Sequence, residues 1–70
     1  MEKKTFEVIG MKCMHCKANV ENAALTLDGV ASADASLEDK NLTVEFDSAK
    51  VSPEQIKDAV EDSGKFELVL

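Results

Sequence analysis

The chain has 70 residues, of which 44% are hydrophobic and 31% are charged, and its formal net charge at pH 7 is −6. This composition is typical of one globular domain rather than of a disordered chain, so we expect a single domain over residues 1–70. The acidic excess and the absence of arginine argue against nucleic acid or an anionic membrane surface as a partner.

The first residues, Met1–Thr5, include no apolar run of the length that a signal peptide needs, and no stretch is long enough to span a membrane. We therefore expect a cytoplasmic location, where thiols stay reduced. The two cysteines are also too few for the disulfide framework of a small secreted protein.

In the first half of the chain, the hydrophobic pattern predicts a strand, a helix and a second strand. Alternation over Thr5–Ile9 indicates a strand that buries one face. Helical spacing from Cys16 to Leu27 indicates a helix that Asp28-Gly29 ends, with Gly29 suited to a left-handed conformation. A strand over Val30–Leu37 follows, although alanine is a poor strand former. The residues expected in the core are Phe6, Val8, Cys16, Val20, Ala23, Ala24, Leu27, Ala33, Ala35 and Leu37.

In the second half, the pattern predicts a hairpin turn over 38–41, a strand, a helix and a last strand. Ser52-Pro53-Glu54-Gln55 is a helix start in which serine caps, proline occupies the first turn and glutamine reaches back. Ser63-Gly64 ends this helix. The residues expected to face the core are Leu42, Val44 and Phe46 on the strand, Val51, Ile56, Ala59 and Val60 along the helix, and Phe66, Leu68 and Leu70 on the last strand.

This order of elements predicts an α+β fold of the ferredoxin-like βαββαβ type, a four-stranded antiparallel sheet with two helices on one face. Right-handed crossovers bring three connections to the same end of the sheet: the cysteine loop, the 38–41 hairpin and the Gly64-Lys65 loop. We therefore expect Lys65 near the cysteines despite its distance in sequence.

Both cysteines lie where the first strand gives way to the first helix, in Gly10-Met11-Lys12-Cys13-Met14-His15-Cys16. Two thiols at this spacing can bind one soft metal ion or oxidise to a disulfide. Cu(I) suits them because this soft ion prefers thiolates, and two thiolates satisfy it in a near-linear arrangement. The low coordination number leaves the ion open to a third, incoming thiol.

The Gly10-Met11-x-Cys13-x-His15-Cys16 loop in a βαββαβ chain resembles the heavy-metal-associated domain family. The likeness extends to the Asp28-Gly29-Val30 turn and the helix end at Glu61-Asp62-Ser63-Gly64. The family includes cytosolic copper chaperones and the amino-terminal domains of copper-transporting P-type ATPases. The resemblance implies a non-enzymatic module that holds Cu(I) on Cys13 and Cys16 and passes it to such an ATPase domain. It also implies a monomer without metal and allows a metal-bridged dimer.

Within the loop, Cys16 is expected to be the more buried sulfur because it lies in line with Val20 on the helix. Cys13 is then the first point of exchange. We expect Met11 to pack in the core under the loop and Met14 to be exposed. His15 is a third ligand in one interpretation and a solvent-exposed neighbour that tunes the thiols in the other, which we favour.

The charges near the thiols are open to two interpretations as well. Lys12, Lys17 and Lys65 can offset the negative charge of a Cu(I) dithiolate, or Lys65 can be a merely solvated loop residue. The second helix carries an acidic face that is either a solvated surface, which we favour, or an electrostatic docking patch. Its residues are Glu54, Asp58, Glu61 and Asp62.

Other activities fit the pair of cysteines less well. A thiol–disulfide oxidoreductase is disfavoured because no tryptophan precedes Cys13 and the only proline, Pro53, starts a helix. A structural zinc site draws on two separated ligand pairs, whereas this chain offers Cys13, His15 and Cys16 close together. Within the metal-binding class, mercury, zinc and cadmium are the alternatives to copper, and Lys12 before the first cysteine favours copper over zinc.

Overall fold

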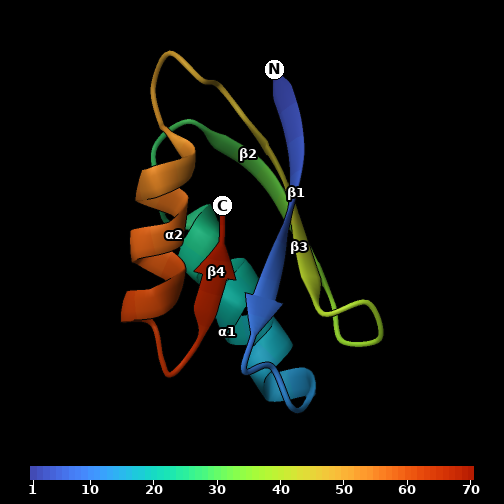
Figure 1. The fold of residues 1–70 in the computed structure, drawn as a ribbon. Helices are drawn as coiled ribbons and strands as arrows, with labels where there is room; N and C mark the ends of the chain where they lie inside the picture. The colour runs from blue at the N-terminus through green and yellow to red at the C-terminus, as the bar shows by residue number, and fades with distance from the viewer.

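The computed structural model describes residues 1–70 and forms one antiparallel sheet in the strand order β2-β3-β1-β4. Both helices pack on the same side of this sheet (Figure 1). The elements in chain order are β1 (Glu2–Ile9), α1 (Met14–Leu25), β2 (Val30–Ser36), β3 (Asn41–Phe46), α2 (Pro53–Asp62) and β4 (Glu67–Val69). The ferredoxin-like fold expected from the sequence is therefore confirmed.

The core lies between the helices and the inner face of the sheet. Alternation along β3 buries Leu42, Val44 and Phe46 completely, as predicted. Helical spacing does the same for Val20 on α1 and for Ile56 and Val60 on α2, while Ala59 is half-buried. The buried cluster comprises Phe6, Val8, Met11, Val20, Ala24, Ala35, Leu42, Val44, Phe46, Val51, Ile56, Val60 and Leu68.

The element ends differ from the sequence expectations where pairing or capping decides them. β1 begins at Glu2 rather than Thr5, because Glu2 pairs opposite Phe46 of β3. α1 ends at Leu25, two residues before Leu27, and Gly29 adopts its left-handed φ of +102° in the turn that follows.

The other differences lie at strand ends. β2 ends at Ser36, and Leu37 packs half-buried against the core from the turn. Leu70 is 62% exposed, so its predicted place in the core is wrong. The pairing of β4 with β1 stops at Val69, which leaves Leu70 without a strand neighbour.

The amino-terminal end of α2 has the predicted capping box. Ser52 Oγ accepts the backbone N–H of Gln55 at 3.3 Å, and Gln55 Oε1 accepts that of Ser52 at 2.9 Å. These bonds satisfy two groups that a helix otherwise leaves without partners. The start and the end of α2 agree with the sequence signals.

A lysine–glutamate pair on α1 holds the outer edge of β2. Glu21 Oε2 accepts Lys17 Nζ at 3.1 Å and the backbone N–H of Ala35 at 2.8 Å. Burial opposes ionisation of Glu21, but the Ala35 N–H and the Lys17 ammonium outweigh burial and lower the pKa of this carboxyl. A polar group at an open sheet edge is thereby paired within the molecule.

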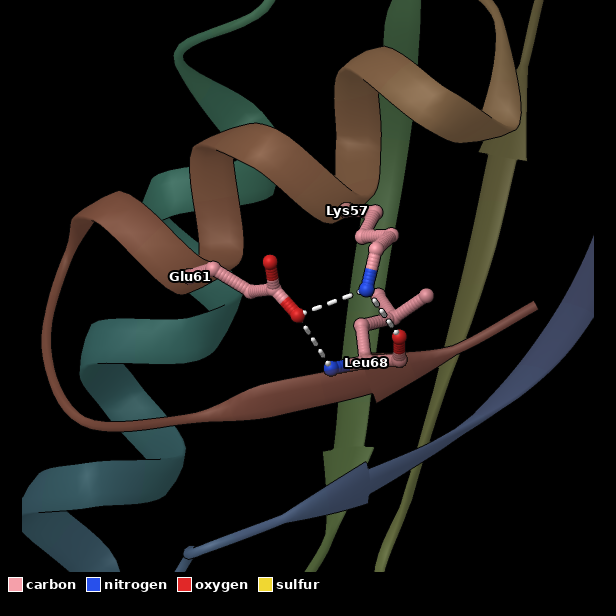
Figure 2. Close-up of polar contacts among 3 residues, drawn as sticks. All are labelled: Lys57, Glu61 and Leu68. Atoms are coloured by element: carbon pink, nitrogen blue, oxygen red, sulfur yellow. Dashed lines mark hydrogen bonds and ion pairs between the residues drawn. The ribbon is translucent and has the colours of Figure 1, made fainter.

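An equivalent pair on α2 holds the outer edge of β4, as Figure 2 shows. Lys57 Nζ donates to Glu61 Oε2 at 2.8 Å and to the carbonyl oxygen of Leu68 at 3.1 Å, and the Leu68 N–H donates to Glu61 at 3.3 Å. Hydrogen bonding between the two side chains lowers the pKa of Glu61 and raises that of Lys57. Glu61 therefore serves this contact, whereas Glu54, Asp58 and Asp62 are exposed.

None of the helices combines the length and the apolar character that crossing a membrane requires.

Candidate metal site

The loop between β1 and α1 lies at the end of the sheet where two other connections meet it (Figure 1). The Val8 N–H donates to the carbonyl oxygen of Lys40, at the end of the β2–β3 turn, at 2.9 Å. On the other side, a Cβ added to Gly10 would lie 2.6 Å from the Lys65 carbonyl oxygen. The predicted convergence of the three connections is confirmed, and it places Lys65 beside the start of the cysteine loop.

The base of the loop is fixed by a turn and by a buried methionine. Gly10 has a φ of +108°, a conformation that side-chain-bearing residues rarely adopt. Met11 is 8% exposed and belongs to the core cluster, so its predicted packing role is confirmed. The thiols that follow therefore stand on a well-packed base.

The helix start brings the two sulfur atoms together. Cys13 is the N-cap of α1 with an extended backbone, and Cys16 lies in the first helical turn. Their Sγ atoms are 3.5 Å apart, and both thiols are free. Cys13 is exposed, whereas Cys16 is half-buried against the core, which confirms the predicted order of burial. One sulfur is thus open to an incoming group while the other is held.

Groups at the helix start lower the pKa of the Cys13 thiol. The backbone N–H of Cys16, the Cys16 thiol and the N–H of His15 together lower the pKa of Cys13. In the thiol form, Cys13 accepts no capping hydrogen bond, but the same N–H groups stabilise the negative charge once the proton leaves. The lowered pKa makes the thiolate of Cys13, the form that binds metal, easier to form than that of an ordinary cysteine.

The lysines near the thiols divide into engaged and free side chains. Lys17 follows Cys16 in the chain, but its ammonium is engaged with Glu21, so its predicted role beside a metal is not supported. Lys12 and Lys65 are exposed and form no ion pair. A hollow of about 500 Å³ at the base of the loop is lined by Lys12 and by Lys40, which sequence reasoning missed, and also by the acidic Glu7 and Asp39. The turn at 38–41 was predicted, but a turn prediction does not indicate where its side chains point.

The remaining loop residues add no clear third ligand. No group of three histidine, cysteine, aspartate or glutamate side chains is arranged to hold a metal ion. His15 and Met14 are both exposed, as expected, and a ligand role for His15 stays a prediction. The available ligands are two sulfur atoms. Two ligands suit an ion that binds in a near-linear arrangement better than an ion that requires four ligands in a tetrahedron.

Comparison with known proteins shows similarity to metal-binding proteins over nearly the whole chain. The family model of the heavy-metal-associated domain matches residues 5–66. The curated copper chaperone CopZ of Staphylococcus saprophyticus is 53% identical over 64 residues, which are 91% of this chain and 94% of that protein.

Solved structures agree with this match. A CopZ metallochaperone has a TM-score of 0.92 and 44% identity, and the match covers 97% of this chain and all of that one (100%). A copper-binding domain of the P-type ATPase HMA7 has a TM-score of 0.90 and 35% identity, with 100% and 96% covered. The likeness includes the cysteine loop, both helices and all four strands. The chain therefore belongs to the heavy-metal-associated domain family.

Proposed function

We propose that this chain is a Cu(I) chaperone that binds the ion through Cys13 and Cys16 and delivers it to a similar domain of a copper-transporting P-type ATPase. The observation that carries the proposal is a pair of free thiols, 3.5 Å apart, of which one is exposed at the tip of the fold. The names of its relatives support this function, because they include copper chaperones and a copper-binding P-type ATPase domain.

Binding replaces two thiol protons by one Cu(I) ion. The lowered pKa of Cys13 assists the first step, since less free energy is needed to remove its proton at neutral pH. The resulting dithiolate complex carries one net negative charge, and the exposed residues Lys12, in the loop, and Lys65, whose backbone lies against Gly10, are the lysines available to offset it.

Transfer follows from the unequal exposure of the two sulfurs. An incoming partner thiolate adds to the ion and forms a three-coordinate sulfur complex. The exposed Cys13 then leaves first, because its sulfur can move into solvent, and the half-buried Cys16 leaves last. Each step exchanges one copper–sulfur bond for another, so no redox change is needed and the chain acts as a carrier rather than an enzyme.

The same exposed sulfur lets two copies share copper. We expect a monomer without metal and a copper-bridged dimer at high protein concentration, and we expect the protein to act in the cytoplasm. Size-exclusion chromatography with and without Cu(I) separates the two states. A dimer that forms without metal contradicts this part of the proposal.

Competition with a Cu(I)-specific chromogenic chelator tests the function. We expect one Cu(I) per chain, with Cys13→Ser and Cys16→Ser each losing most of the affinity. Met14→Leu is the matched control, because it removes an exposed sulfur from the same loop and should leave binding unchanged. Failure to compete with a weak chelator, or equal loss in the Met14 variant, contradicts the proposal.

Metal identity is tested by comparing Cu(I) with Zn(II), Cd(II) and Hg(II) in the same assay. X-ray absorption at the copper edge should show two sulfur ligands and no nitrogen from His15. Transfer is checked by mixing the loaded protein with an isolated ATPase metal-binding domain and following the copper by mass spectrometry. Insulin reduction should not be catalysed, because the thiols serve metal exchange.

A further inference from the structure

The turn between α1 and β2 contains a reactive dipeptide, Asp28-Gly29, that metal handling does not use. Asp28 is exposed, and its carboxylate takes part in no hydrogen bond or ion pair. The Gly29 N–H donates no hydrogen bond either. Because glycine has no side chain to hinder its nitrogen, this nitrogen is free to attack the carboxyl group that precedes it.

We propose that Asp28 is a site of spontaneous isomerisation to isoaspartate in the folded protein. The Gly29 nitrogen attacks Cγ of the protonated Asp28 carboxyl, and the new N–Cγ bond closes a five-membered succinimide. The amide hydrogen and the carboxyl OH leave together as water. Water then opens the ring at either carbonyl, and opening at the backbone carbonyl gives isoaspartate. The overall reaction gains and loses no atoms and needs no oxidant.

The fold protects two comparable aspartate–serine dipeptides of the same chain from this reaction. At Asp47-Ser48, the carboxylate Oδ1 of Asp47 is held by the Ala49 N–H at 3.0 Å. At Asp62-Ser63, the Ser63 N–H is engaged with the carbonyl oxygens of α2 at 3.2 and 3.3 Å. At each of these two dipeptides, either the carboxylate or the following N–H is held by a hydrogen bond. At Asp28-Gly29, both the carboxylate and the N–H are free.

Isomerisation changes the local structure, because isoaspartate adds one atom to the main chain. The turn is tight: the Gly29 carbonyl oxygen accepts the Asp47 N–H at 2.8 Å, and a Cβ on Gly29 would lie 2.7 Å from Lys50 Cβ. We therefore expect the product to unfold at a lower urea concentration. The turn lies at the opposite end of the molecule from the cysteine loop, so copper stoichiometry should not change (Figure 1).

The experiment is prolonged incubation of the full chain in mildly acidic buffer, below its unfolding temperature. Isoaspartate is measured by isoaspartyl methyltransferase labelling and located by mass spectrometry of peptides. We expect severalfold more isoaspartate at Asp28 than at Asp47 or Asp62. Asp28→Glu keeps the charge but requires a larger ring, and it should remove the signal.

A parallel incubation in urea separates the effect of the fold from that of the sequence. Without the fold, Asp47 and Asp62 should also react readily, whereas in the native chain isoaspartate should form severalfold more at Asp28 than at either of them. The proposal is overturned if Asp28 reacts in urea but not in the native chain, or if Asp47 and Asp62 react equally in both. These measurements do not involve metal, so their outcome is independent of whether the chain binds copper.

Discussion

At the residue scale, two cysteines separated by only two residues differ in what surrounds them. Cys13 stands outside the first turn of α1 in solvent, and Cys16 leans against the core. The sequence predicted this order of burial because helical spacing aligned Cys16 with Val20. It also predicted the packing of Met11. The engagement of Lys17 with Glu21 was not predictable, because Glu21 is positioned by a strand residue fourteen positions away, Ala35.

Alkylation checks the difference between the thiols. We expect iodoacetamide to modify Cys13 severalfold faster than Cys16 in the metal-free protein, because Cys13 is the more exposed thiol and its pKa is lowered from the ordinary value. A lowered pKa means that its thiolate, and hence its rate, appears at lower pH than for an ordinary cysteine. The measurement is peptide mapping over a pH series. Faster labelling of Cys16, or an inflection above the ordinary value of 9.0, contradicts the assignment.

Gly10 is the second residue whose identity the structure explains. We expect Gly10→Ala to destabilise the protein by about 1–3 kcal/mol, the usual cost of placing a side chain in such a conformation. The added Cβ also lies 2.6 Å from the Lys65 carbonyl oxygen, so the loops must separate. Urea unfolding measures the loss, and Ser48→Ala, at an exposed turn, is the control. Equal midpoints for the two variants argue against a tight contact.

At the element scale, the two helices show what sequence signals determine. The bounds of α2 were predictable because Ser52 and Pro53 start it and Ser63-Gly64 ends it. The start of α1 was not, because its N-cap is a cysteine, which is not a typical capping residue. The start of β1 was not predictable either, since polar residues there are ordered by pairing with β3.

The lysine–glutamate pairs at both sheet edges predict a pH dependence of stability. The pKa values of Glu21 and Glu61 are lowered in the folded state, so their contribution is present above the unfolded value, about 4.3. It is lost as the pH falls through the lower, folded values. The urea midpoint should therefore decrease through this acidic range.

Neutral variants test these pairs. Glu21→Gln should cost about 1 kcal/mol at pH 7, because the amide still accepts the Ala35 N–H but no longer attracts Lys17. The double variant Glu21→Gln, Glu61→Gln should flatten the acid dependence. Glu38→Gln, in the exposed turn, serves as the control. An unchanged pH profile in the double variant would mean that other carboxyls cause the effect.

At the scale of the whole molecule, we expect the fold to be independent of the metal. The core cluster contains thirteen residues, and neither cysteine is among them. We expect the circular dichroism spectrum and the urea midpoint of the metal-free chain to be unchanged by excess chelator, and Cys13→Ser to fold normally. A chain that loses its helices in chelator would instead be a structural metal domain. The content of large apolar residues gives the same expectation from the sequence, whereas the bonds from Glu21 and Glu61 that close both sheet edges were not predicted.

The N-cap of α1, Cys13, makes no side-chain capping hydrogen bond, whereas the N-cap of α2, Ser52, does. This difference predicts a difference in local dynamics. The Gln55 amide is capped by Ser52 Oγ, whereas Cys16, at the matching position of α1, faces a sulfur that accepts no capping bond. Hydrogen–deuterium exchange should therefore be faster at Cys16 than at Gln55. We expect local opening of this turn to let the sulfur–sulfur distance adjust to an arriving ion while the packed core beneath it keeps its shape.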